Sequence, residues 1–228
     1  MAYRTPFVSG KDSLSNQLRY TDPATGQQKL IEIPPTLLIT GMAIVSDVAR
    51  CVSMDAKQPG STLLLIGETS GKLGGSLVHT LHNPQTIADM PRVDLKKGPA
   101  TAKLVASLIA QGLVASAHDC SEGGVLTAVA EMLIAGDSPK AARLGAELSP
   151  KLGNLSAAAF AFSEDHSRYV LEVATSNVAA VQQAAAAAGI TVTQLGTLNN
   201  LGVLAWSACD VRMQIDELAK AWLTPLDW

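Results

Sequence analysis

Hydrophobic residues in this chain fall into short continuous runs, which alternate with longer segments where they recur every three or four positions. Short runs of β-branched residues and leucine between turn residues predict buried strands, and the longer periodic segments predict helices. Strands are predicted at residues 36–45, 61–67, 113–118, 143–148, 168–173, 190–195 and 203–207, and helices at residues 46–54, 74–82, 94–111, 124–135, 177–188 and 211–222. The pattern is typical of an α/β (α+β) protein with two sheet-plus-helix layers, of which the first is small.

Turn residues divide the chain into two predicted domains. Gln58-Pro59-Gly60 is the strongest turn between the first polar segment and the regular alternation that follows it, and it sets the boundary between residues 1–57 and 58–228. Within the first segment, residues 21–26 read as a hairpin or a loop tip. The strand predicted at 36–45 is continuously apolar, so we expect it to be buried on both faces.

Composition narrows the class of protein. The chain has 228 residues, 47% of them hydrophobic, a net charge of −3 and only 4% aromatic residues. Scattered basic residues and few aromatics argue against nucleic acid or an anionic membrane as partner, and no run approaches the roughly 20 apolar residues of a membrane span. Three distant cysteines, Cys51, Cys120 and Cys209, fit no zinc spacing or disulfide framework, so we expect a cytoplasmic protein.

The segment at residues 114–124 is the strongest candidate for chemistry. A predicted strand ends in His118-Asp119, and Gly123-Gly124 open the next predicted helix. Acidic groups and glycines at this point can hold a divalent cation or approach a phosphate. A plain capped helix, with Ser121 as the N-cap, explains the same residues. We expect Cys120 to be packed in the core rather than reactive.

Three further segments carry polar groups that suit a ligand. The loop at residues 6–16 offers a glycine, a lysine, an aspartate and hydroxyls, but exposed turns share that composition. Four glycines at residues 67–76 match neither the P-loop nor the dinucleotide spacing, which favours a turn before a helix. The dense polar stretch at residues 163–168 reads, in isolation, as a salt-bridged turn.

Taken in order, these segments resemble the phosphoribosylformylglycinamidine synthase family, within the aminoimidazole ribonucleotide synthase-like superfamily of ATP-dependent enzymes. The resemblance covers essentially the whole chain. It rests on the loop at 6–16, Ile33-Pro34-Pro35-Thr36, Leu64-Leu65-Ile66-Gly67, Leu73-Gly74-Gly75-Ser76, Ala117-His118-Asp119-Cys120-Ser121-Glu122-Gly123-Gly124, Phe162-Ser163-Glu164, Ser167-Arg168-Tyr169 and the final helix with Ala221-Trp222.

The resemblance implies two domains and an incomplete enzyme. The family's synthetase has two repeats, each with a β-rich N-terminal domain and an α/β C-terminal domain. Residues 1–57 would then be a partial N-terminal-type domain of the second repeat, and residues 58–228 its aminoimidazole ribonucleotide synthase-like C-terminal domain. The missing first repeat carries the family's catalytic histidine. We therefore expect no catalytic residue here and no activity from the isolated chain.

The resemblance also implies roles for one loop. Gly10 matches a glycine that contacts ATP, and Ser13 matches a serine that contacts the substrate, formylglycinamide ribonucleotide. Lys11 stands where the family has an asparagine that touches magnesium, and a cation cannot take that role. We expect Lys11 to meet an ATP phosphate instead and Asp12 to supply the metal contact.

Three other residues are assigned roles by comparison with the family's repeats. Asp119 occupies the place of a metal-binding aspartate, in a repeat that keeps a structural nucleotide in larger family members. Ser163 and Glu164 match a turn on the substrate side of the other repeat. ATP and Mg²⁺ are thus the expected cofactors.

In the reaction that the resemblance implies, ATP activates the formyl amide oxygen as an iminophosphate, and ammonia from a glutaminase partner displaces the phosphate. Residues 1–55 are expected to be the least stable region, and an unpaired sheet edge there would allow a homodimer. An alternative is a stand-alone structural or nucleotide-binding subunit that completes a separate first-half chain. A selenophosphate or hydrogenase-maturation enzyme is disfavoured, because those relatives lack Gly-Lys-Asp-Ser followed by Ile-Pro-Pro-Thr.

Overall fold

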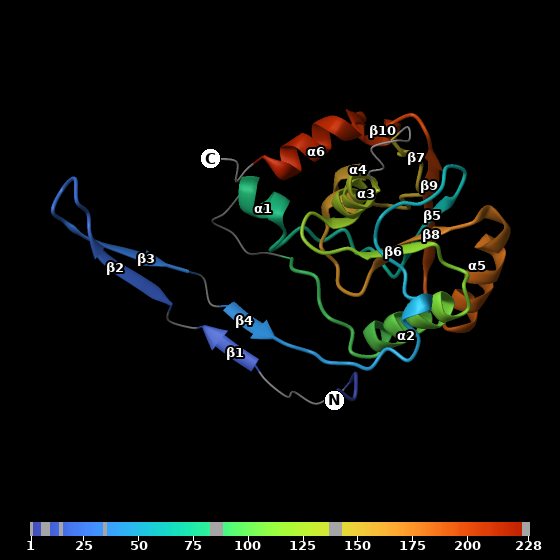
Figure 1. The fold of residues 1–228 in the computed structure, drawn as a ribbon, viewed down its shortest axis with the longest axis horizontal. Coiled ribbons are helices and arrows are strands. Elements are labelled where there is room, and N and C mark those ends of the chain that lie inside the picture. The colour runs from blue at the N-terminus through green and yellow to red at the C-terminus, as the bar shows by residue number, and fades with distance from the viewer. Residues whose placement is uncertain are drawn as a thin grey trace. The chain divides into compact units, whose positions relative to one another are not determined.

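The computed structural model describes residues 2–5, 10–13, 16–33, 36–82, 89–136 and 143–224; of residues 10–13 and 36–38 it describes the backbone alone. The chain divides into two compact units, Met1–Ser46 and Asp47–Trp228. Helices and strands carry the labels of Figure 1.

The first unit consists of two small antiparallel ladders. β1 (Gly10–Ser13) pairs with β4 (Thr36–Ile39), and β2 (Gln17–Thr21) pairs with β3 (Gln28–Glu32). The predicted hairpin tip is confirmed, since the carboxylate of Asp22 accepts a hydrogen bond from the Ala24 backbone N–H at 2.9 Å and Gly26 turns the chain at φ +68°.

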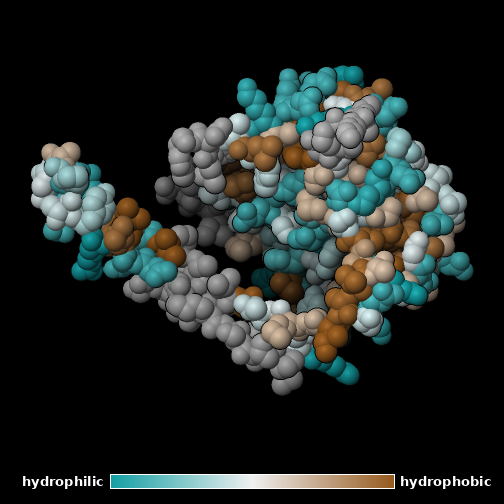
Figure 2. Space-filling view, in the orientation of Figure 1, coloured by the Kyte–Doolittle hydropathy of each residue, from teal (hydrophilic) through white to brown (hydrophobic). Residues whose placement is uncertain are grey.

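Every residue of β2 and β3 is exposed, including Leu18 at 59% and Leu30 at 48%. In the space-filling view, hydrophobic residues accordingly reach the surface of this hairpin (Figure 2). A two-stranded ribbon has no second layer to cover either face, so alternation of residue type along it produces no core.

Two predictions for residues 36–54 are wrong. The strand ends at Ile39, not at residue 45, and residues 40–45 are exposed, with Ile44 98% accessible. β4 has one neighbour in its sheet, whereas burial on both faces requires packing layers on each side. The predicted helix at 46–54 is a single 3₁₀ turn, Val48–Arg50, capped by Asp47 instead of Ser46.

The second unit is built on a seven-stranded mixed sheet in the order β11-β10-β7-β9-β5-β8-β6 (Figure 1). Only β10 and β7 run parallel; the other neighbours are antiparallel. The strands are β5 (Thr62–Ile66), β6 (Ser116–Asp119), β7 (Gly145–Leu148), β8 (Tyr169–Val173), β9 (Val192–Asn199), β10 (Val203–Trp206) and β11 (Val211–Gln214).

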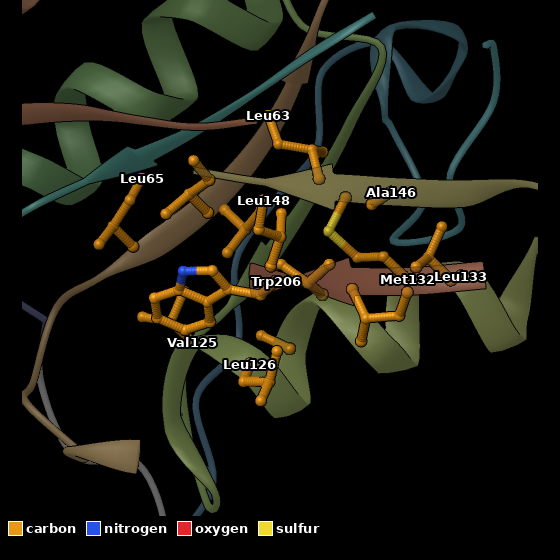
Figure 3. Close-up of a cluster of buried hydrophobic side chains, with 14 of the residues drawn as sticks. Leu63, Leu65, Val125, Leu126, Met132, Leu133, Ala146, Leu148 and Trp206 are labelled. Atoms are coloured by element: carbon orange, nitrogen blue, oxygen red, sulfur yellow. The ribbon is translucent and has the colours of Figure 1, made fainter. Parts of the chain in front are cut away.

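Helices cover both faces of this sheet, which confirms the α/β (α+β) prediction. One face packs against α3 (Gly124–Ala135), α4 (Ala157–Phe162) and α6 (Ile215–Leu223), with Trp206 and Met132 at the centre (Figure 3). The other face packs against α2 (Lys97–Ala110) and α5 (Val178–Ala187). The other helices among the described residues of this unit are α1 (Leu77–His82) and the 3₁₀ turns Val48–Arg50, Thr175–Asn177 and Ser207–Cys209.

The central strand β5 explains how a run of apolar residues becomes fully buried. Leu63 and Leu65 point into the core with α3, while Leu64 and Ile66 point into the core with α2 and α5. Successive strand residues face opposite sides, so a strand covered on both faces needs hydrophobic residues at every position.

Near the start of this unit, a buried carboxylate holds the chain. Glu172 of β8 is inaccessible to solvent and accepts hydrogen bonds from the backbone N–H groups of Lys57 at 2.7 Å and Gln58 at 2.9 Å, and from the Ser116 hydroxyl at 3.0 Å. These donors compensate the cost of burying the charge, and they fix residues 57–58 to the middle of the domain.

Two element predictions in this unit need correction. The predicted helix at 211–222 begins as strand β11, which pairs with β10, and becomes helical only at Ile215. Helix α4 was not predicted at all. The other predicted strands and helices are present, although their ends shift by up to about four residues.

Candidate functional site

A polar cavity of about 380 Å³ lies where β6 ends and β8 begins. Asp119 and Tyr169 pair directly across these antiparallel neighbours, so the residues after β6 and those before β8 meet at one edge of the sheet. The lining combines the end of β6 and its turn with the turn before β8: Asp119, Cys120, Ser121, Glu122, Glu164, Asp165, His166, Ser167, Arg168 and Tyr169.

Asp119 presents an ionised carboxylate to this cavity. Its side chain is 59% exposed, accepts a hydrogen bond from the Ser121 hydroxyl and lies 3.3 Å from His118 Nδ1. The Ser121 hydrogen bond is the main cause that lowers the pKa of Asp119 below its ordinary value. The other nitrogen of His118, Nε2, is 2.8 Å from Glu131 on α3, which fixes the ring between two carboxylates.

The alternative of a helix capped by Ser121 is wrong in detail. The N-cap of α3 is Gly123, at φ +80°, and the Ser121 hydroxyl bonds Asp119 instead. Gly124 is required by packing, because a Cβ there would lie 2.6 Å from the Ser163 carbonyl oxygen. Gly124 thus lets the turn before β8 approach the start of α3, whereas a Cβ at Gly123 would meet the Thr127 side chain of α3 itself.

Glu164 ties that turn to two helices. Its Oε1 accepts hydrogen bonds from the backbone N–H groups of Leu77, at the start of α1, and of Gly123, each at 2.8 Å. A carboxylate is favoured at helix N-termini, where backbone donors are unpaired and the dipole is positive. Ser163, by contrast, is fully buried and does not line the cavity; within the described residues its hydroxyl has no hydrogen-bond partner.

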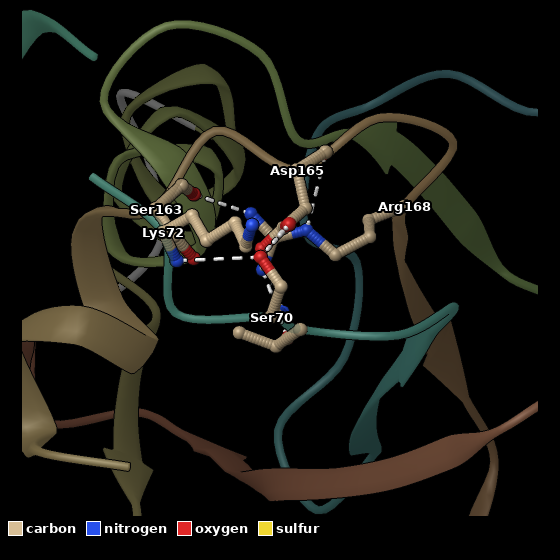
Figure 4. Close-up of polar contacts among 6 residues, drawn as sticks. Ser70, Lys72, Ser163, Asp165 and Arg168 are labelled. Carbon is tan, nitrogen blue, oxygen red and sulfur yellow. Dashed lines mark hydrogen bonds and ion pairs between the residues drawn. The ribbon is translucent and has the colours of Figure 1, made fainter. Parts of the chain in front are cut away.

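The key residue that the sequence did not single out is Arg168. Its side chain is fully buried and donates hydrogen bonds to the Ser163 carbonyl, to the Thr69 hydroxyl at 2.9 Å and to the Asp165 carbonyl at 3.3 Å (Figure 4). Asp165 in turn accepts hydrogen bonds from the backbone and hydroxyl of Ser70.

Burial lowers the pKa of Arg168 from its ordinary value, as expected for a cation removed from water. Its ion pair with Asp165, at 4.0 Å, confirms the salt-bridged turn predicted for residues 163–168. The dense charges of that turn were the only signal in the sequence, because Thr69 and Ser70 are about a hundred residues away.

Cys120 belongs to the core, as predicted. It is 7% exposed, and burial raises the pKa of its thiol to about 12. Such a thiol stays protonated at neutral pH and is a poor nucleophile.

The remaining predicted residues lie in the first unit. Gly10, Lys11, Asp12 and Ser13 form β1, and their side chains lie outside the described residues.

For a metal, the exposed carboxylates that line the cavity are those of Asp119 and Glu122. Among residues 2–5, 10–13, 16–33, 36–82, 89–136 and 143–224, no group of three or more His, Cys, Asp or Glu is close enough to hold an ion. Asp119 fits Mg²⁺ as a single ligand, since this ion keeps several waters and is commonly bound by one or two carboxylates plus phosphates. Among the same residues, no helix is long and apolar enough to cross a membrane.

Comparison with known proteins identifies relatives over most of the chain. The phosphoribosylformylglycinamidine synthase subunit PurL of Acidiphilium cryptum is 37% identical over 191 residues, which is 84% of this chain and 24% of that protein. The Thermus thermophilus subunit of the same name is 33% identical over 233 residues, 99% of this chain and 28% of that protein. The chain therefore spans about a quarter of the length of these relatives.

The fold also matches a solved structure. Thermotoga maritima PurL complexed with FGAR superposes with a TM-score of 0.62 over 75% of this chain and 30% of that one, at 18% identity. Residues 58–205 match the family described as AIR synthase related protein, C-terminal domain. This chain belongs to the AIR synthase related protein family, through that C-terminal domain.

Proposed function

We propose that this chain contributes the C-terminal α/β domain of the second repeat of a phosphoribosylformylglycinamidine synthase. That ATP-dependent ligase converts formylglycinamide ribonucleotide to formylglycinamidine ribonucleotide in purine biosynthesis, a cytoplasmic pathway. The observation that carries the proposal is the similarity, at 33–37% identity, to relatives of one name along 84–99% of the chain. The family match beginning at residue 58 supports a domain boundary between residues 57 and 58.

The chain spans about a quarter of its relatives, so we infer that the reaction needs further polypeptide. The remaining parts are the first repeat, which supplies the catalytic histidine, and a glutaminase that supplies ammonia. Taken alone, these 228 residues bind ligands but do not turn over.

Within this assignment, Asp119 is the proposed Mg²⁺ ligand of the second unit. Its lowered pKa supports the role, because only the ionised carboxylate coordinates a cation. When bound, Mg²⁺ would neutralise nucleotide phosphates beside it. Glu164 lines the same cavity and is the proposed substrate-side contact. For Ser163, the proposed contact with substrate rests on the family resemblance alone, because this residue does not line the cavity.

The loop of the first unit has its own proposed contacts, which rest on the family resemblance. Gly10 and Lys11 meet ATP, Asp12 supplies a metal contact, and Ser13 contacts formylglycinamide ribonucleotide. Phosphoryl transfer depends mainly on alignment and on positive charge around the phosphates, which a glycine backbone and a lysine can provide.

Reconstitution tests the assignment. The chain is assayed with ATP, Mg²⁺, ammonia and formylglycinamide ribonucleotide, first alone and then with a separately produced polypeptide that covers the rest of a relative. We expect no product from the chain alone and product from the mixture. Robust turnover by the chain alone would contradict the fragment assignment, and no turnover from a stably associated mixture would contradict the synthase assignment.

Calorimetry with Mg-ADP tests the role of Asp119. Asp119→Asn should weaken binding, whereas Asp210→Asn, an exposed aspartate after β10, should not. Equal binding by both variants would remove Asp119 from the site.

The alternative, a stand-alone subunit that completes a separate first-half chain, draws support from the exposed leucines of the β2–β3 hairpin, which suit a partner. A reading frame that continues upstream of Met1 would exclude this alternative.

A further inference from the structure

A second and larger cavity, of about 570 Å³, lies in the same unit. It is formed by the loop after β5, the start of α2, the loop after β7, the turn before β8 and the start of β9. None of the seven residues predicted to bind ATP, substrate or metal lines it. Its volume lies within the range of small-molecule sites.

The charges available in this cavity are positive. Four cations line it: Lys72, Arg92, Lys97 and Lys151. Lys72 pairs with the exposed Asp89, and Lys97 pairs with Glu68. Arg92 and Lys151 make no ion pair with any residue that the structure describes, and both are exposed.

The acidic residues of the cavity are already engaged. Glu68 is held by Lys97. Asp94 accepts hydrogen bonds from the backbone N–H groups of Lys96 and Lys97, at 2.8 and 2.9 Å, and these donors lower its pKa. Asp165 is bound by Ser70 and Arg168 (Figure 4). Arg92 and Lys151 are therefore available to an entering anion. The carboxylates of Glu68, Asp94 and Asp165 each have another partner already.

Apolar side chains and hydroxyls also line this cavity. Leu152, Leu155, Phe160 and Ile190 contribute apolar surface, and the hydroxyls of Thr191 and Thr193 lie at the start of β9. A cavity whose lining combines cations with apolar side chains suits a ligand with a charged group and an organic body.

We propose that this cavity binds a small phosphate monoester. The phosphoryl group meets Arg92 and Lys151, and the organic body contacts the apolar lining. The buried Arg168–Asp165–Ser70 network holds the wall, so the site is formed before the ligand arrives. This site is separate from the residues of the proposed synthase function and does not rest on that function.

Calorimetry at low salt on the full chain tests the proposal, with ribose 5-phosphate, AMP, adenosine and inorganic phosphate as probes. We expect at least one monoester to bind more tightly than both adenosine and inorganic phosphate. Binding by ribose 5-phosphate alone would identify a sugar as the organic body, and binding by AMP would show that a base is accommodated.

Variants locate the binding site. Arg92→Gln combined with Lys151→Gln should weaken monoester binding by about tenfold or more, because two charges near the phosphoryl group are lost. Lys103→Gln, an exposed lysine of α2 that lines neither cavity, is the matched control and should bind like the unaltered chain. Asp119→Asn should also leave ribose 5-phosphate binding unchanged, which separates this site from the metal site proposed above.

Three outcomes would overturn the proposal. The first is that neither monoester binds. The second is that inorganic phosphate binds as tightly as both monoesters, which indicates an adventitious ion only. The third is that the double variant binds like the unaltered chain. None of these outcomes depends on synthase turnover, so the two proposals fail separately.

Discussion

The β2–β3 hairpin and the strand β5 each contain four hydrophobic residues, spread over ten positions in the hairpin and five in β5, and they differ completely in burial. All five residues of β5 are buried, while all ten residues of β2 and β3 are exposed. β5 lies between two strands and under helices on both faces, whereas the hairpin pairs only with itself. Hydrophobic sequence thus predicts a strand, but a second layer decides whether that strand belongs to a core.

The largest expected effect concerns local stability. Amide hydrogens of β5 and β8 should exchange only through global unfolding, whereas those of β2 and β3 should exchange through local opening. We expect a difference in protection on the order of a thousandfold, equivalent to about 4 kcal/mol. Hydrogen exchange read by mass spectrometry measures it, and equal protection in a monomer would break the comparison.

A second test compares one buried arginine of the second unit with one exposed arginine of the hairpin. Arg168→Met leaves Asp165 as an unpaired buried charge and should lower the free energy of unfolding of the second unit by about 3–5 kcal/mol. Arg19→Met, on the exposed strand β2, should change it by less than about 0.5 kcal/mol. Urea unfolding followed by the fluorescence of the buried Trp206 gives both values. A loss below about 1 kcal/mol for Arg168→Met would show that its network is not needed for stability.

Two leucines give a similar test without charge. Leu64→Ala removes a fully buried side chain from β5 and should cost about 2–4 kcal/mol through lost burial and the cavity left behind. Leu30→Ala, in β3, should cost less than about 0.5 kcal/mol. Thermal and urea unfolding check the pair; a comparable loss for Leu30→Ala would reveal a partner that covers the hairpin.

The smallest effect is a pH dependence, and it belongs to the second unit alone, since all three cysteines lie there. The pKa of Cys120 is raised from 9.0 to about 12, so above pH 9 the unfolded chain releases this proton before the folded one does. Stability is therefore fully present below pH 9 and falls as the pH rises further, by about 1.4 kcal/mol at pH 10. The loss of stability above pH 9 should be smaller in Cys120→Ala. An identical dependence of stability on pH in this variant would show that other groups cause the loss.

Much of the second unit could be predicted from sequence because its elements are long or fully buried. Residues 124–135 were predicted as a helix with the bounds that α3 has, and residues 61–67 contain β5. Helix α4 escaped because six residues, four of them alanine, show no clear period. Strand β11 escaped because its register depends on pairing with β10, which no local pattern reveals.

The candidate site could be predicted only in part, because it too depends on contacts between segments that are distant in the sequence. Asp119 and Glu164 were recognised from local motifs, and both line one cavity. The Arg168 network and the larger cavity join residues that are about a hundred or more positions apart, such as Thr69 and Arg168. Sequence patterns describe only residues that are close along the chain. They cannot predict a cavity whose lining comes from three distant loops, because the folded sheet is what brings those loops together.

The buried carboxylate of Glu172 has a mechanical consequence. Tension applied through residues 47–57 would meet several attachment points in the second unit. The Arg50 side chain donates a hydrogen bond to the Ala110 carbonyl at 2.7 Å, the Ser53 carbonyl accepts one from the Ala117 N–H at 3.3 Å, and the backbone of Lys57 and Gln58 is fastened to Glu172. Glu172 is therefore one of several anchors, and a load on this segment is spread over α2, β6 and β8 instead of falling on a single strand.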